Sequence, residues 1–199
     1  MTAAGGAVAI LAGGRARRLG GVVKPLLLVE GQRIIDRQLA VLRHLFDRIV
    51  IVANEPAPFA DLGVAVIPDR RGPGLGPLAG IDAALAFFSS APAVVCVAGD
   101  MPFLEPALLR ALRDAPPALA VVPRVRGRAE PLCARYDRAF SPLVAAALAA
   151  NALTVHTLLR DAGAVFLEEP ALRALDPALR SFTNLNTPHD LLPAAGGDG

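Results

Sequence analysis

The sequence contains little lysine, few aromatic residues and only two cysteines, and each shortage limits what the protein can be. Lysine occurs once, at Lys24, so 19 of the 20 basic residues are arginine. Aromatic residues make up 5% of the chain and tryptophan is absent, so the core must consist of Ala, Val, Leu and Ile. The net charge is only +2, which argues against nucleic acid as a partner held by charge alone.

Two further absences concern metal sites and membranes. Cys96 lies in an apolar run, where a buried thiol is expected, and neither Cys96 nor Cys133 has the spacing of a zinc site. No segment approaches the roughly 20 apolar residues that span a bilayer. The apolar N-terminal run is short and lacks a basic flank, unlike a signal peptide. We therefore expect a soluble, cytoplasmic protein with no membrane partner.

Short apolar runs alternate with segments of helical periodicity. Strands that are apolar throughout are typical of a parallel sheet covered by helices on both faces. We predict an α/β fold, a three-layer Rossmann-like domain with a mostly parallel sheet. The expected strands cover 7–11, 48–53, 64–67, 93–97 and 119–122, and the expected helices cover 33–46, 78–88 and 105–114.

The pattern changes in the second half, where we expect an antiparallel addition at an edge of the sheet and a wall that binds an acceptor. The chain length and the lack of a linker predict one domain over 1–193, followed by a disordered tail over 194–199. The expected strands cover 132–136, 165–167 and 182–185, with helices over 138–150 and 154–162 and a last turn over 188–192.

A glycine- and arginine-rich segment from Gly13 to Lys24 follows the first predicted strand. Glycine lets backbone N–H groups approach phosphate oxygens, and Arg18 and Lys24 add positive charge. The lone lysine suggests a need for a compact ammonium group. The segment has neither the Gly-Lys-Ser/Thr of a Walker loop nor a Gly-x-Gly-x-x-Gly fingerprint. We favour a site for nucleotide phosphates over a surface turn with solvated arginines.

Polar residues follow three other predicted strands, and the carboxyl ends of parallel strands meet at one edge of a sheet. Asp100, placed after Gly99, suits a Mg²⁺ ligand shared with substrate phosphates, and a turn or helix cap is the alternative. Asn54 and Asp69 could bind a base edge or a ribose hydroxyl, although each taken alone favours a turn role. The glycine-rich segment 72–81 is either a ligand contact or a loop-to-helix junction.

Later features are candidates for binding an acceptor. Asn184 and Asn186 share one face if their segment is extended. Glu130-Pro131 and the cluster of Arg124, Arg126 and Arg128 border a later strand. They either grip an anionic acceptor or form a solvated loop. The histidines are scattered and form no Ser-His-Asp or Cys-His arrangement, so covalent catalysis is not indicated.

Four motifs give the chain a family resemblance. They are Leu-Ala-Gly-Gly at 11–14 followed by Lys24, Gly-Pro-Leu-Ala-Gly at 76–80, Gly-Asp-Met-Pro at 99–102 and Asn-Leu-Asn-Thr-Pro at 184–188. With these motifs in this order over nearly its whole length, the chain resembles the molybdenum cofactor guanylyltransferases. These belong to the nucleotidyltransferases that join a nucleoside triphosphate to a sugar, polyol or pterin phosphate.

The resemblance implies Mg²⁺-dependent transfer of GMP from GTP to the terminal phosphate of molybdenum-bearing molybdopterin, with release of pyrophosphate. It also implies transient contacts with proteins that supply molybdopterin and with apo-molybdoenzymes. Catalytic roles fall on Lys24, Arg18 and Asp100, with Asp100 as the metal ligand. Asn184 and Asn186 would lie near the reacting phosphates or the acceptor. Arg124, from the arginine cluster, is a further candidate for acceptor binding. The implied nucleotide-binding residues are Leu11, Ala12, Gly13, Gly14, Lys24, Asn54, Asp69 and Asp100.

The sequence departs from the family pattern at two sites. Val23 stands where an aspartate often precedes the lysine, and His189-Asp190 replaces an acidic pair. The alternatives are a cytidylyltransferase or another sugar- or pterin-phosphate nucleotidyltransferase, or a non-catalytic carrier of GTP or molybdopterin. Lys24 and Asp100 are both present, which favours an enzyme.

Overall fold

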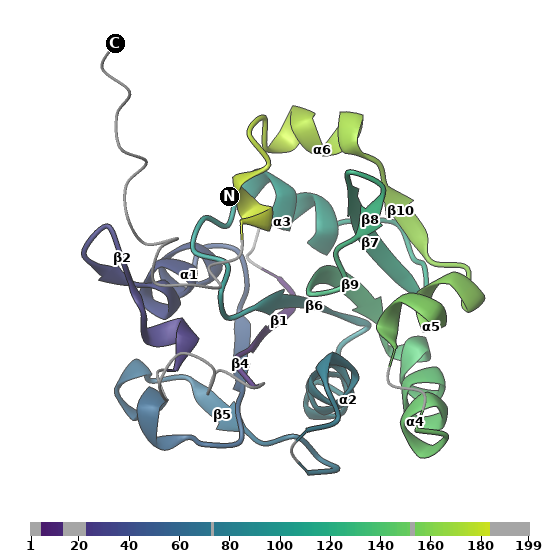
Figure 1. Cartoon of the computed structure of the whole chain (residues 1–199), viewed down its shortest axis with the longest axis horizontal. Coiled ribbons are helices and arrows are strands. Elements are labelled where there is room, and N and C mark those ends of the chain that lie inside the picture. The colour runs from purple at the N-terminus through teal and green to yellow at the C-terminus, as the bar shows by residue number, and fades with distance from the viewer. Residues whose placement is uncertain (1–4, 14–22, 73, 152–153, 184–199) are drawn as a thin grey trace.

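The first part of the chain forms four parallel strands: β1 (Ala7–Leu11), β4 (Arg48–Val52), β5 (Ala65–Ile67) and β6 (Ala93–Ala98). The computed structural model describes residues 5–13, 23–72, 74–151 and 154–183, and these strands run through its middle in the order β5-β4-β1-β6 (Figure 1). Each strand begins within one residue of its predicted start, because a continuous apolar run with polar flanks marks a buried strand clearly.

The second part adds β7 (Ala120–Val125), β8 (Arg128–Ala129), β9 (Cys133–Asp137) and β10 (Val165–Leu167). The antiparallel strand was predicted at an edge, and this detail is wrong. β9 lies inside the sheet, antiparallel to β6 on one side and to β7 on the other, and β10 forms the edge parallel to β7. The physical reason is that four consecutive residues of β9 are buried, which suits an interior strand.

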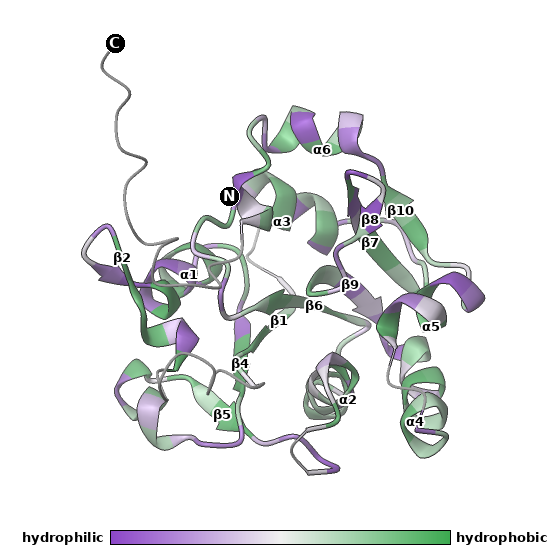
Figure 2. Ribbon diagram, viewed as in Figure 1, coloured by the Kyte–Doolittle hydropathy of each residue, from purple (hydrophilic) through white to green (hydrophobic). Residues whose placement is uncertain are grey.

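Helices cover both faces of the sheet and give the three predicted layers (Figure 1). Apolar side chains alternate along β1, so that Val8 and Ile10 belong to one core and Ala7, Ala9 and Leu11 to the other. Figure 2 shows the hydrophobic colour concentrated on the strands and on the adjoining helices. One face is covered by α1 (Ile34–Leu42), α3 (Pro106–Arg113) and α6 (Glu169–Leu175), and the other by α2 (Pro77–Phe87), α4 (Ser141–Ala149) and α5 (Val155–Asp161).

Short elements complete the described part of the fold, namely the hairpin of β2 (Leu28–Val29) and β3 (Gln32–Arg33) and several 3-10 helices. The 3-10 helices span Lys24–Leu26, Ala57–Leu62, Arg138–Phe140 and Arg180–Phe182. None of the helices in the described part of the chain has the length and apolar character that crossing a bilayer requires.

The strand predicted over 182–185 is wrong at its start, because Phe182 ends a 3-10 helix. The carboxylate of Asp176 accepts hydrogen bonds from the backbone N–H groups of Arg180 (3.0 Å) and Ser181 (2.8 Å), which fixes this turn. Thr183 caps this 3-10 helix, and residues 184–185, the turn over 188–192 and the tail over 194–199 lie outside the described residues.

Candidate active site

The carboxyl ends of β1, β4, β5 and β6 meet at one edge of the sheet, as predicted. Backbone hydrogen bonds connect the residues that follow these strands: Ala12 N–H donates to Val52 O (3.0 Å), Ala53 N–H to Ile67 O (2.8 Å) and Gly99 N–H to Leu11 O (3.0 Å). This edge therefore brings together the predicted residues Leu11, Ala12, Gly13, Asn54, Asp69 and Asp100.

Lys24 and Asp100 form an ion pair at this edge, although 76 positions separate them in the sequence. Lys24 Nζ lies 3.2 Å from Asp100 Oδ2, and the two side chains are 24% and 21% exposed. A partly exposed pair of this kind is accessible to a ligand. It brings an ammonium and a carboxylate, which phosphate chemistry needs, to one place.

Gly99 allows the turn before Asp100 to approach the segment that carries Lys24. A Cβ atom at residue 99 would lie 2.8 Å from Pro25 Cγ and 3.3 Å from Ala12 Cα. Real Cβ atoms essentially never make a contact as short as 2.8 Å, so a larger residue at position 99 would shift the Pro25 segment away from the turn. The glycine therefore sets the distance between the lysine and the carboxylate.

The side chain of Gln38 holds the turn that carries Asp100. Sequence analysis did not identify this residue. Its side chain is buried on α1, and Nε2 donates to Ala98 O (2.7 Å) and to Met101 O (2.9 Å), the carbonyls on either side of Gly99-Asp100. The available signal was a polar residue on the apolar face of a predicted helix. An amide at that position indicates a backbone segment that needs two donors.

Asn54 and Asp69 bind each other at the ends of β4 and β5. Asn54 Nδ2 donates to Asp69 Oδ2 (2.9 Å), and Asp69 N–H donates to Asn54 Oδ1 (2.9 Å). A Cβ atom at Gly13 would lie 3.9 Å from the same carboxylate oxygen. Asn54 therefore orients the Asp69 carboxylate beside the first loop, a coupling that the two residues taken separately did not indicate.

The connection between β5 and α2 is anchored by Asp82, a second residue that sequence analysis missed. The Asp82 side chain is 2% exposed, and Oδ2 lies 3.5 Å from Arg70 Nη1 and 3.8 Å from Arg71 Nε. A Cβ atom at Gly80 would lie 3.2 Å from Leu11 Cδ2, so glycine lets α2 pack closely on β1. The close packing accounts for this glycine without a ligand.

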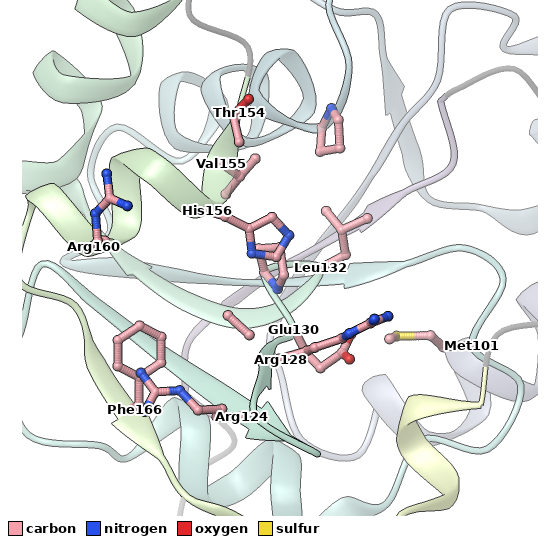
Figure 3. A pocket seen from close by; sticks show the side chains of 14 residues that line it. Met101, Arg124, Arg128, Glu130, Leu132, Thr154, Val155, His156, Arg160 and Phe166 are labelled. Carbon is pink, nitrogen blue, oxygen red and sulfur yellow. The ribbon is translucent and has the colours of Figure 1, made fainter.

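A cavity of about 980 Å³ adjoins this edge, bordered by Met101 and by Pro77 at the start of α2 (Figure 3). The second half of the chain supplies most of its wall, from the segment between β7 and β9, from α5 and from β10. Positive charge prevails in the lining. The ionisable lining residues are Arg124, Arg128, Glu130, His156 and Arg160.

Arg124, predicted to grip an acceptor, lines this cavity but already has partners. Its Nη1 lies 2.7 Å from Glu168 Oε1, and its guanidinium carbon lies 3.8 Å from the centre of the Phe166 ring. Figure 3 shows the side chains of Arg124 and Phe166 next to each other. Its charge is therefore partly compensated. The other predicted residues Gly14, Arg18, Asn184 and Asn186 lie outside the described residues.

Asp100 is the residue that fits a metal ion. No group of three or more His, Cys, Asp or Glu side chains is assembled within the described ranges, which argues against a cage of protein ligands there. Mg²⁺ is commonly held by one or two carboxylates together with substrate phosphates. The single partly exposed carboxylate of Asp100, beside the Lys24 ammonium, matches that donor set.

Comparisons with known proteins agree with this geometry. Residues 8–165 match the family model described as MobA-like NTP transferase domain. The chain is 39% identical over 189 residues to the molybdenum cofactor guanylyltransferase of Rhodobacter capsulatus, covering 93% of this chain and 92% of that protein. It is 37% identical over 186 residues to a probable molybdenum cofactor guanylyltransferase of Pelotomaculum thermopropionicum, covering 93% and 89%.

A solved structure is similar over the same extent. The crystal structure of molybdopterin-guanine dinucleotide biosynthesis protein A from Archaeoglobus fulgidus aligns with a TM-score of 0.79 at 30% identity. The alignment covers 92% of this chain and 94% of that one. The likeness therefore includes both the edge of the sheet that carries Asp100 and the second half of the chain, which forms most of the cavity wall.

Proposed function

Because the chain belongs to the MobA-like NTP transferase family, we propose that it transfers GMP from GTP to the terminal phosphate of molybdenum-bearing molybdopterin. The products are molybdopterin guanine dinucleotide cofactor and pyrophosphate. Relatives named for this activity align with nearly all of the chain, and the similar Archaeoglobus protein is named for the synthesis of the same dinucleotide.

The observation that carries this proposal is the ion pair between Lys24 and Asp100 at the carboxyl edge of the sheet. A carrier protein needs to bind GTP, but it does not need a metal-binding carboxylate beside a phosphate-binding lysine. Their close approach, set by Gly99 and by the donors of Gln38, supports group transfer rather than storage.

The reaction needs no protein nucleophile. An oxygen of the acceptor's terminal phosphate attacks the α-phosphorus of GTP, and the bond from that phosphorus to the bridging oxygen of the β-phosphate breaks. Pyrophosphate leaves with the electron pair of that bond. The attacking phosphate is already ionised at neutral pH, so no general base is required.

This chain's own residues stabilise the charge that the reaction redistributes. We expect the Lys24 ammonium and backbone amides after β1 to bind the phosphates, with Arg18 as a second cation. Asp100 would hold Mg²⁺, which supplies Lewis-acid stabilisation of the phosphate oxygens when it is bound. The Asn54–Asp69 pair lies beside Gly13, where it is suited to hold the nucleoside.

The cavity beside Met101 is the proposed acceptor site. Its arginines suit an anionic ligand, and it adjoins the Asp100 turn, where the acceptor phosphate has to meet GTP. Asn184 and Asn186 follow Thr183, and we propose that they complete the wall near the reacting phosphates. Transient docking of molybdopterin-supplying proteins and of apo-molybdoenzymes would occur around this opening.

A panel of the four nucleoside triphosphates, each with Mg²⁺ and molybdenum-bearing molybdopterin, tests the proposal. We expect dinucleotide product and pyrophosphate with GTP, and neither product without the acceptor. Product from CTP at a comparable rate would replace the guanine assignment with a cytidylyltransferase. Tight GTP binding without any pyrophosphate release would instead identify a carrier.

A further inference from the structure

Among the described residues that line the cavity, Glu130 is the single acidic one, and none of them binds its carboxylate. It follows β8 on the segment that leads into β9, and its side chain is half-buried. Within the described part of the chain, no hydrogen bond or ion pair engages its carboxylate. Burial raises the pKa of the Glu130 carboxyl, and the positive charge of Arg128 opposes that rise.

The other acidic groups around the cavity have clear structural roles. Glu168 pairs with Arg124 at 2.7 Å, and Glu169 pairs with Arg173 at 2.7 Å and accepts the backbone N–H of Arg126. Glu130 has no such role, yet it projects into the cavity, where Figure 3 shows its side chain and that of Arg128 extending toward Met101. A partly desolvated carboxylate without donors is costly unless a ligand supplies them.

The acceptor's chemistry supplies those donors. A phosphate would be repelled by Glu130, so the arginines are the partners for that end of the molecule. A pterin ring carries a 2-amino group and an N3–H side by side on one edge. Two parallel donors match the two oxygens of a carboxylate in the same way as a guanidinium does.

We propose that Glu130 binds the 2-amino and N3–H edge of the acceptor's pterin and selects pterins over rings that lack the 2-amino group. This inference rests on the proposed function, because it takes the acceptor to be a pterin phosphate. It assigns separate roles within one cavity: the arginines hold the anionic end, and Glu130 holds the ring.

The test compares two fluorescent probes, the phosphate ester of 6-hydroxymethylpterin and that of 6-hydroxymethyllumazine. The lumazine carries an oxo group in place of the 2-amino group, so it presents an acceptor where Glu130 needs a donor. Binding is measured by quenching of probe fluorescence, which no tryptophan of the protein obscures. We expect the wild-type protein to prefer the pterin ester by about tenfold or more, as for a hydrogen bond to a charged group.

Glu130→Gln keeps the shape of the side chain but replaces one acceptor oxygen with a donor, so the preference should fall to within about threefold. Glu130→Ala removes both acceptor oxygens and should also abolish the preference for the pterin ester. Glu169→Gln is the matched control, because it removes one negative charge from a residue outside the cavity lining and should keep the full preference. Affinity for GTP should be unchanged in all three variants.

Equal binding of the two esters by the wild-type protein, or a pterin preference that survives in Glu130→Gln, would overturn the inference. A raised Mg²⁺ requirement in Glu130→Gln with an unchanged preference would overturn it too, and would indicate a metal ligand. The proposed function is tested separately by dinucleotide formation in the wild-type protein. If the wild-type enzyme forms dinucleotide but shows no preference for the pterin ester, only the role of Glu130 is contradicted and the proposed function stands.

Discussion

Lys24 is the side chain whose replacement tests the proposed chemistry most directly. We expect Lys24→Arg to lower kcat by about a hundredfold or more, because a planar guanidinium cannot act as a point charge among crowded phosphate oxygens. Stability should barely change, since a partly exposed ion pair contributes about 1 kcal/mol or less. Steady-state kinetics measures kcat and thermal unfolding measures stability. Arg110→Lys, on the exposed side of α3, is the control and should change neither.

The same residue offers a chemical test, because the chain has no other lysine. GTP with Mg²⁺ should protect Lys24 from acylation, as peptide mass spectrometry would show. Equal labelling with and without GTP would place the side chain outside the nucleotide site. A fully active Lys24→Arg enzyme would show that any positive charge suffices.

Asp100 can be tested with an isosteric change. Asp100→Asn keeps the shape and removes the charge, so the Mg²⁺ concentration needed for half-maximal rate should rise and turnover should collapse. The fold should survive, because the side chain lies at the sheet edge outside the core. Turnover close to wild type at limiting Mg²⁺ would contradict the assignment of this residue as the metal ligand.

At the scale of elements, the turn that carries Asp100 depends on helix α1 through Gln38. Gln38→Met keeps the volume but removes both donors from Ala98 O and Met101 O, which costs about 1–3 kcal/mol of stability. If Gln38 positions Asp100, the variant should also lower kcat and raise the Mg²⁺ requirement, with the KM for the acceptor nearly unchanged.

A variant destabilised elsewhere in the same core separates positioning from folding. Leu112→Ala on α3 should cost about 2–5 kcal/mol, yet leave the Mg²⁺ dependence of the folded enzyme as in wild type. If Gln38→Met and Leu112→Ala show the same Mg²⁺ dependence, Gln38 has only a structural role. Gln38→Asn, which keeps the amide donors on a side chain one methylene shorter, should recover part of the metal affinity.

The elements show which parts of the fold a sequence can reveal. The four parallel strands β1, β4, β5 and β6 and the helices α1, α2 and α3 were predicted, because their apolar patterns are regular, whereas the two-residue strands β2 and β3 were missed. Helix α6 was missed, because of its seven residues only Leu172 is buried. Gln38 and Asp82 were missed because their partners lie elsewhere in the sequence. Gln38 binds backbone carbonyls after β6, and Asp82 pairs with arginines of the preceding loop. Periodicity within a helix does not reveal such partners.

At the scale of the whole molecule, β9 joins the two halves of the chain. Tyr136 on β9 stands opposite Val94 of β6 and opposite Ala120 of β7. The interior position of β9 could not be predicted, because pairing between remote strands is set by which edges the other strands leave open. One domain over 1–193 remains a prediction, and Tyr136 provides the means to test it.

Tyr136 is the only tyrosine, it is fully buried, and its hydroxyl donates to Pro131 O at 2.7 Å. Burial raises the pKa of this phenol well above 10, and the nearby Cys96 and Cys133 raise it further. The unfolded chain ionises its tyrosine near pH 10, whereas the folded chain keeps it neutral. The free energy of unfolding must therefore fall as the pH rises above about 10.

We expect tyrosinate absorbance to appear in one alkaline transition together with the loss of helical circular dichroism and of GTP binding. All three should coincide if both halves unfold as one unit, because β9 cannot expose Tyr136 without leaving β6 and β7. GTP with Mg²⁺ should shift the whole transition to higher pH, since it binds only the folded chain. Tyrosinate that forms while GTP binding persists would show that the second half opens independently, and would contradict the single domain.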